Sequence, residues 1–323
     1  MRSLVRTLLV AALLAALATT FAFAQDPVSL GLKFTENEAV NYNVSFSGSG
    51  SLVAPDGQRA TLLLQGSFTL LQTAVQVQQD GSAVLETLLP KADLTITVKD
   101  QQARFSYADG KLRWFAQGKE QTPPQQDLSK LPLLAIPVRI TTKPDGSITG
   151  IAFADTSFLD MLQKVAPSLA TSLPSLPAIN TSPLLPATPV RIGESWSKNE
   201  ALPLPTGDSA TYRTRRTLDS VTGSGNLQLA KLSGFAETRY RGKPSTIAGP
   251  GGQSVTISIP DLRQTLASTE FFNIGRGRLV RGDYDMQFAT QVSATVAGTT
   301  QGGKVEARLL AIVQEKTGVT AAE

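Results

Sequence analysis

Residues 40–46 read Val40-Asn41-Tyr42-Asn43-Val44-Ser45-Phe46, so that large apolar side chains alternate with smaller polar ones. Because successive side chains of a strand point to opposite faces, this stretch predicts a β-strand with one buried face. Leu94, Ile96 and Val98 repeat the pattern in residues 94–98. One buried and one solvated face is typical of antiparallel sheets, and the chain is therefore predicted to be mainly β.

Asp-Gly pairs punctuate the first half of the chain, and this dipeptide suits the positive backbone φ angles of tight hairpin turns. The four pairs are Asp56-Gly57, Asp80-Gly81, Asp109-Gly110 and Asp145-Gly146. Around the third pair, Phe105 and Tyr107 are expected to face Trp114 and Leu112 across a hairpin. Between residues 62 and 77 the period-2 pattern slips by one position, which predicts a β-bulge near Leu70.

The middle of the chain differs from both flanks. Apolar residues recur at helical spacing from Phe158 to Leu169, and Asp155 or Thr156 is suited to cap the start, so a helix is predicted at about 156–172. Prolines then punctuate the sequence up to Pro189, as in an extended connection.

The predicted organisation has four parts: a signal peptide (1–24), a first antiparallel β half (25–155), a helix plus Pro-rich linker (156–189) and a second antiparallel β half (190–323). The two halves are expected to form two curved sheets or half-barrels around the central helix.

The start of the chain predicts export. Arg2 and Arg6 precede an apolar run from Leu8 to Ala18, and Ala22-Phe23-Ala24 has the small-x-small pattern of a cleavage site. No cysteine follows it to carry a lipid anchor, and no later apolar run reaches the roughly 20 residues of a membrane helix. We therefore expect a periplasmic or secreted protein of bacterial type, without a lipid anchor and without a membrane span after cleavage.

Two residue types are absent. The chain has no histidine and no cysteine, so it has no disulfide and lacks the commonest general base and the commonest metal ligand. We expect neither an enzyme nor a cofactor or metal site. Ser195 and Lys198 fit S-x-x-K, and Ser224-Gly225-Asn226 and Lys316-Thr317-Gly318 fit the companion motifs of penicillin-binding proteins. The β-like surroundings of Ser195 argue against this match, because that serine must begin a buried helix.

Charged residues offer two further candidates. Arg213, Arg215, Arg239 and Arg241 lie at same-face positions of predicted strands, and would form a basic face for headgroups or an acidic polymer; a solvated strand face is the simpler reading. Few aromatic residues accompany them, so nucleic acid is not expected as a partner. Asp283 and Asp285 share a strand face, and glycosidases use paired carboxylates as their catalytic groups.

Val190-Arg191-Ile192-Gly193-Glu194-Ser195-Trp196 resembles a V-x-x-G-(D/E)-x-W phrase of uncharacterised β-rich exported bacterial proteins. Tyr212, Gly277-Arg278-Leu279 and the opening Leu32–Glu38 resemble companion features of that family. The resemblance implies an exported β-protein and assigns no functional residue. The bent strands and apolar helix also resemble envelope lipid carriers, in which a curved sheet and helices enclose an apolar cavity.

Three functions remain open after these observations. The first is a non-catalytic envelope protein that binds an apolar or amphipathic ligand, such as a lipid, in a cavity between sheet and helix. The second is a structural or interaction module that contacts an envelope protein or acidic polymer. The third is a hydrolase that uses carboxylates alone. Trp114 and Trp196, the two tryptophans, are expected either to line a cavity or, more simply, to fill the core.

Overall fold

The computed structural model describes residues 26–54, 57–121, 137–154, 183–203, 209–240, 245–248, 254–258, 261–296 and 299–316. The predicted signal peptide, the predicted helix at 156–172 and Arg241 lie outside these residues. The described strands are β1 (Ala39–Val53), β2 (Arg59–Val77), β3 (Ala83–Val98), β4 (Gln101–Ala108), β5 (Lys111–Ala116), β6 (Lys119–Gln121), β7 (Val138–Thr142), β8 (Ile148–Phe153), β9 (Ser195–Pro203), β10 (Ser209–Thr222), β11 (Leu229–Tyr240), β12 (Ser245–Ala248), β13 (Ser254–Ser258), β14 (Leu262–Asn273), β15 (Arg278–Val296) and β16 (Thr299–Glu315). A 3₁₀ turn at Gly225–Leu227 joins β10 to β11.

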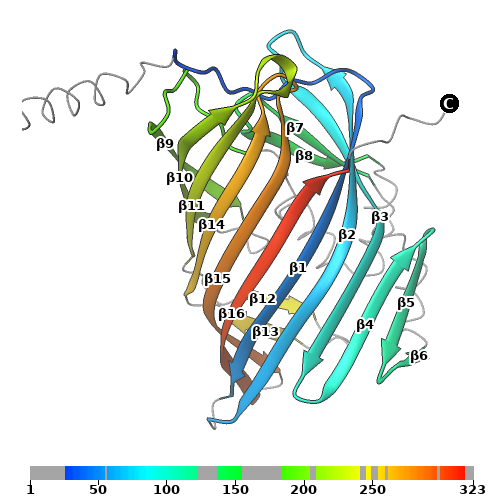
Figure 1. The fold of residues 1–323 in the computed structure, drawn as a ribbon. Helices are drawn as coiled ribbons and strands as arrows, with labels where there is room; N and C mark the ends of the chain where they lie inside the picture. Colours follow the sequence, from blue (N-terminus) through cyan, green and yellow to red (C-terminus); the bar gives the residue numbers. More distant parts are fainter. Residues whose placement is uncertain are drawn as a thin grey trace, which may run out of the picture.

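These strands form one antiparallel sheet whose main path runs β6-β5-β4-β3-β2-β1-β16-β15-β14-β11-β10-β9 (Figure 1). The mainly antiparallel β fold is therefore confirmed. The two predicted halves are one sheet rather than two, because β1 pairs with β16 from Tyr42↔Glu315 to Val53↔Lys304. Sequence alternation could not reveal this pairing, because it predicts which face a side chain occupies but not which strand lies beside it.

The hairpin predicted at Asp109-Gly110 is confirmed. Asp109 and Gly110 have φ angles of 52° and 73°, as a two-residue type I′ turn requires. The register places Phe105 opposite Trp114 and Tyr107 opposite Leu112, as their alternation indicated.

The irregularity predicted near Leu70 is also present, as a shift in the pairing of β2 with β3 between Thr69 and Leu71. The extra residues lie on β3, where Thr69 pairs with Lys91 and Leu71 pairs with Leu88. Pro90 falls in this gap, and proline has no backbone N–H to donate to a ladder. β2 itself keeps its phase here, since Leu70, Gln72 and Ala74 are all buried; the bulge on β2 lies between Ala74 and Gln76.

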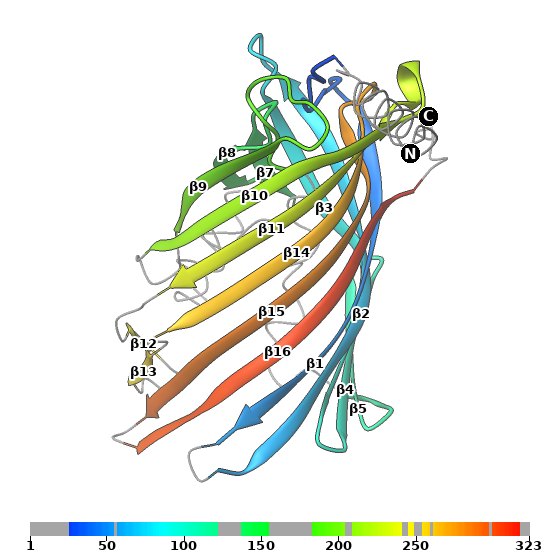
Figure 2. The ribbon, with the colours of Figure 1, turned by 60° about the vertical axis from the view of Figure 1, so that its left-hand side comes forward.

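The two faces of the sheet differ in chemistry. We call the face on which β7, β8 and residues 28–34 lie the inner face, and the opposite one the outer face. The sheet curves around the inner side, with β4 and β5 across from β10 and β11 (Figure 2). On β1 the outer positions are Ser45, Ser47, Ser49 and Ser51, whereas the inner positions include Tyr42, Val44 and Phe46.

A core forms at one end of the inner face, which we call the closed end. Residues 28–34 and 184–190 pack there against strands of the second half. The cluster consists of Leu30, Leu32, Leu185, Val190, Leu218, Ala230, Leu232 and Phe272, all 7% exposed or less. Chain segments thus provide the second layer that a sheet with one apolar face needs.

Contacts at the closed end also link strand β9 to the β7–β8 turn. Lys198 Nζ on β9 lies 2.6 Å from Asp145 Oδ2, and it also donates to Ser147 Oγ at 3.0 Å. Trp196 Nε1 donates to Leu184 O at 3.0 Å, and Leu185 N donates to Asp145 O at 2.8 Å. We call these the closing contacts. Since β7 pairs with β3, they join the β9 end of the sheet to the β3 side.

Candidate apolar ligand-binding face

Away from the closed end, the inner face stays apolar but is no longer buried. Along β1, Tyr42 is 4% exposed whereas Leu52 is 42% exposed. The half-buried or exposed inner residues form a continuous surface across β1–β5 and β16, which we call the open apolar face. Its large members are Phe46, Leu52, Leu62, Leu64, Phe68, Leu94, Ile96, Val98, Phe105, Leu112, Trp114, Val305 and Leu309.

The exposure ends at β11. The inner residues Ala236, Thr238 and Tyr240 of that strand are all buried, and Tyr240 is 4% exposed at the far end of its strand. Between β16 and β11, the inner residues Leu266 of β14 and Phe288 of β15 are half-buried.

Two pairs of aromatic rings lie on the open apolar face. Phe105 and Trp114 stack with centroids 5.4 Å apart and an interplanar angle of 27°. Phe46 and Phe68 lie 6.2 Å apart and are tilted. Gly66 sits beside the Phe46 ring, which a side chain on that residue would strike. A glycine inside a strand often marks such a close approach, so Gly66 was a readable sign of this ring position.

The two tryptophans occupy different environments. Trp196 packs against the closed-end core, where its N–H is satisfied by Leu184 O. Trp114 lines the open apolar face, and its Nε1 is buried without a hydrogen-bond partner among the described residues. The core-filling prediction thus fits Trp196, whereas the cavity-lining one stays a prediction for Trp114.

One charged pair is buried on the inner face. Arg216 on β10 donates two hydrogen bonds to Glu270 on β14, at 3.0 and 2.9 Å. The intervening strand contributes Gly234, where a side chain would strike Ser268 Oγ on β14. Beside this pair, burial raises the pKa of Tyr284 well above its usual value, and the negative charge of Glu270 adds to the shift. The charges of Arg216 and Glu270 cancel, so this part of the inner face is electrically neutral.

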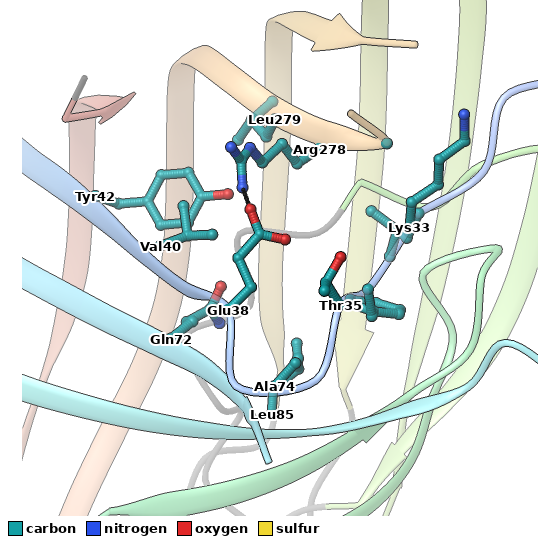
Figure 3. A pocket seen from close by; sticks show the side chains of 13 residues that line it. Lys33, Thr35, Glu38, Val40, Tyr42, Gln72, Ala74, Leu85, Arg278 and Leu279 are labelled. Carbon is teal, nitrogen blue, oxygen red and sulfur yellow. Dashed lines mark hydrogen bonds and ion pairs between the residues drawn. The ribbon is translucent and has the colours of Figure 1, made fainter. Parts of the chain in front are cut away.

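Figure 3 shows a small pocket at the closed end, between residues 32–42 and the start of β15. Glu38 accepts a hydrogen bond from Arg278 at 2.5 Å, and Arg276 and Arg278 both pair with Glu315. Burial raises the pKa of Glu315, although Arg278 opposes the shift. The pocket holds about 50 Å³, which is room for one or two water molecules and far below the roughly 300 Å³ of a small-ligand site.

The predicted basic face lies on the outer side. Arg213 and Arg215 are exposed on β10, opposite Glu237 and Phe235 of β11. Arg239 pairs with Glu237 at 2.7 Å. The pairing register therefore brings three of the four predicted arginines onto one surface, with one acidic residue among them.

The paired carboxylates also lie on the outer face, each held by an arginine. Asp283 pairs with Arg281 at 2.9 Å, and Asp285 pairs with Arg308 at 2.7 Å. The hydrogen bond from Arg308 lowers the pKa of Asp285. A general acid of a glycosidase requires the opposite shift, so Asp285 is not suited to that role.

The S-x-x-K pattern does not form a catalytic pair. Ser195 shares a hydrogen bond with Thr217 on the outer face, whereas Lys198 binds Asp145 from the inner face. Within the described ranges no group of three or more acidic side chains is arranged to hold a metal ion. The same part of the chain contains no helix long and apolar enough to cross a membrane.

Comparison with known proteins gives no family assignment, since no family profile and no curated sequence matches the chain. Among solved structures, a lipovitellin structure on lipid–protein interactions aligns at TM-score 0.42 and 11% identity over 90% of this chain. The chain spans about a quarter (26%) of that lipovitellin chain. OpdQ of Pseudomonas aeruginosa aligns at TM-score 0.21 and 9% identity, covering 86% of this chain and 99% of the other. An outer membrane channel from Pseudomonas putida F1 aligns at TM-score 0.23 and 9% identity, covering 91% and 100%. All three scores lie below 0.5, a range in which the likeness carries no argument about function.

Proposed function

We propose that this is an exported, non-catalytic envelope protein that binds the acyl chains of a lipid on the open apolar face. The observation that carries the proposal is the change along single strands, where inner side chains pass from buried at the closed end to exposed at Leu52. The signal-like residues 1–24 support export into the envelope.

Burial of apolar surface favours the binding of a ligand on this face. A sheet with one apolar side gains stability by covering it, and each buried methylene group contributes about 0.8 kcal/mol. An acyl chain supplies many methylene groups without any polar group that would lose its hydration. The serine-rich outer face of β1 remains available to water, so ligand binding needs only one side of the sheet.

The direct test is native mass spectrometry of the mature protein purified from its own envelope fraction, followed by organic extraction. A discrete added mass that leaves on extraction as a lipid is expected. A bare polypeptide mass would contradict the proposal, and would favour the interaction module described below.

Neighbouring leucines on β2 offer a matched pair of variants. Leu64 belongs to the open apolar face, whereas Leu63 points to the outer face and is 48% exposed. Leu64→Glu is expected to remove most of the co-purifying lipid, because a carboxylate on the open apolar face has to be desolvated by the bound chain. Leu63→Glu should retain it. Equal retention in both variants would place the lipid elsewhere.

A second function, an interaction module for an acidic envelope polymer, is favoured by one observation on the outer face. Phe235 is 53% exposed and stands opposite Arg215, and Arg213 lies in the next row of the same face. An exposed ring among guanidinium groups suits an anionic partner. Charge reversal at the three arginines should release the protein from the envelope fraction if this is its attachment surface, and unchanged fractionation would exclude the role.

A further inference from the structure

We infer that the outer face binds a glycan chain that carries acidic groups, in a groove that follows β1 on the side opposite the open apolar face. This inference goes beyond the lipid role, and it rests on the second function above, to which it gives a site and a ligand class. The observation behind it is a pair of hollows in the serine-rich surface of β1.

The two hollows lie in line along β1. The larger holds about 670 Å³ and crosses five neighbouring strands, from Thr61 of β2 to Arg263 of β14. The smaller holds about 280 Å³ and includes Ser45 and Ser67. Ser45 of the smaller hollow and Ser49 of the larger one belong to the same row of outer side chains on β1. We call this line of hollows the outer groove, and its larger part exceeds the roughly 300 Å³ of a small-ligand site.

Small side chains on β1 form the floor of the outer groove. Ser45, Ser47 and Ser49 are exposed, whereas larger side chains stand beside them, with Leu63 of β2 opposite Ser49 and Leu310 of β16 opposite Ser47. Residues 43–51 span roughly 27 Å, at about 3.4 Å per residue. The outer groove is therefore long and shallow, which suits an extended chain.

The lining of the outer groove favours a glycan over a peptide. Strand β1 is paired on both sides, with β2 and with β16, so its backbone has no free edge to which a peptide strand could be added. Its side chains instead offer hydroxyl groups, and Gln287 adds an amide. These groups both donate and accept hydrogen bonds, as sugar hydroxyls do. Leu63 and Leu310, 48% and 47% exposed, offer apolar contacts for the C–H faces of sugar rings.

Positive charge surrounds the larger hollow. Arg263 and Arg308 line it, and Arg263 is paired in the strand register with Arg239 of the predicted basic face, so the outer groove and the basic face are one surface. Level with residues 47–53 of β1, the described outer residues from β10 to β2 carry seven cations against four carboxylates. The cations are three arginines of the basic face with Arg59, Arg263, Lys304 and Arg308, and the carboxylates are Glu237, Asp261, Asp285 and Glu306. This excess attracts an anionic chain.

The arginines of the outer groove are open to a ligand although they have acidic neighbours. The Arg308 side chain is 58% exposed and binds Asp285 through Nε and Nη2. The Arg263 side chain is 63% exposed beside Asp261. A guanidinium group has several N–H donors in a planar fork that matches a carboxylate. A uronic acid unit supplies such a carboxylate next to its hydroxyl groups, and we therefore expect acidic sugars of this kind.

The test uses the full-length mature protein, with an oligogalacturonate as the acidic probe and a malto-oligosaccharide of the same length as the neutral one. Equilibrium dialysis at low salt gives the affinity for each. Ser49→Tyr fills the floor of the outer groove and should weaken oligogalacturonate binding by at least about 10-fold. Ser106→Tyr, on the outer face of β4 and outside both hollows, is the matched control and should bind as the wild type does.

A second pair of variants tests the charges. Arg263→Gln/Arg308→Gln should weaken oligogalacturonate binding about 5- to 10-fold, whereas Lys111→Gln/Arg113→Gln, which removes two exposed cations of β5, should not. Added salt should weaken binding in the wild type. Equal binding by Ser49→Tyr and Ser106→Tyr, or equal affinity of the wild type for the two probes, overturns the inference.

The outcome is separable from that of the other proposals. Wild-type protein that binds neither probe overturns the inference but leaves lipid co-purification untouched. If charge reversal at Arg213, Arg215 and Arg239 then still releases the protein from the envelope fraction, the second function stands with a protein as its partner.

Discussion

The closed end and the open apolar face are made by the same strands, yet inner side chains are buried at the first and partly exposed at the second. On β2, Leu70 is 1% exposed, whereas Leu62 and Leu64 six to eight residues earlier are only half-buried. Their side chains are equally apolar and lie on the same face. What differs is the packing around them: Leu70 forms a buried cluster with Tyr42 and Leu279 at the closed end. Residues 28–34 and 184–190 build the larger core of that end. Strand pattern therefore determines which face is apolar, and contacts between distant parts of the chain determine where that face is buried.

The largest expected effect contrasts one phenylalanine from each region. Phe272 is fully buried in the closed-end core, so Phe272→Ala should lower the free energy of unfolding by about 3–5 kcal/mol through lost contacts and a cavity. Phe46→Ala on the open apolar face should cost roughly 1–2 kcal/mol in delipidated protein, because that ring is already partly hydrated. Urea unfolding monitored by circular dichroism measures both. Similar losses would show that the open face is packed like a core.

The buried ion pair provides the next test. Glu270→Ala leaves Arg216 charged and unpaired on the inner wall, and is expected to cost about 3 kcal/mol. The double variant Arg216→Met/Glu270→Leu, which removes both charges, should recover most of this loss. Calorimetric unfolding measures the stability of the two variants. A double variant that is no more stable than Glu270→Ala would mean that the pair stabilises the wall beyond neutralising itself.

A smaller effect is expected at the closing contacts, and it depends on pH. Burial of Asp145 opposes its charged form, but hydrogen bonds from Lys198 and Ser147 outweigh this and lower its pKa. A lowered folded-state pKa gives stability that is complete above the unfolded-state pKa and is lost as pH falls through the folded-state value. Asp145→Asn should therefore cost on the order of 1 kcal/mol at pH 7.

The difference between Asp145→Asn and wild type should shrink as the pH falls below 4, where the wild-type carboxyl group is itself protonated. Unfolding curves at pH 7 and pH 3 for both proteins measure it. A difference that stays constant with pH would assign the loss to packing of the turn.

The smallest effect is expected on the outer face. Replacing Arg213, Arg215 and Arg239 by alanine should change the unfolding free energy by no more than about 0.5 kcal/mol per site, because exposed side chains and exposed ion pairs contribute little. Lipid content should not change either. A larger loss would mean that the outer face is covered in the native assembly.

The sequence alone predicted the strands, their faces and several turns, because these depend on residues close together in the chain. The period-2 pattern of residues 40–46 correctly assigns the inner face of β1, and Asp109-Gly110 correctly places a type I′ turn. The bulge predicted near Leu70 is present in the β2–β3 pairing, but its extra residue lies on β3, and β2 changes phase only between Ala74 and Gln76.

The remaining features depend on contacts between distant residues. Asp145 and Lys198 form their ion pair across 53 positions, and no local pattern marks either as a partner of the other. Arg216 was indistinguishable by type from the exposed Arg213 and Arg215, and its buried partner Glu270 lies two strands away and 54 positions along the chain. The partnerless N–H of Trp114 is visible only once its surroundings are known.

The pairing of β1 with β16 also has a consequence for the order in which the protein folds. Tyr42 and Glu315 are paired neighbours at the middle of the sheet although 273 positions separate them in the chain. Loop closure over such a distance is slow, and non-local pairing of this kind lowers folding rates. Until the last strand arrives, β1 and β15 each present a long edge with unpaired hydrogen-bonding groups, which is the form of a chain most prone to aggregate. For the export proposed above, this delay would be an advantage, because the pairing of β1 with β16 cannot form until both ends of the chain have crossed the membrane.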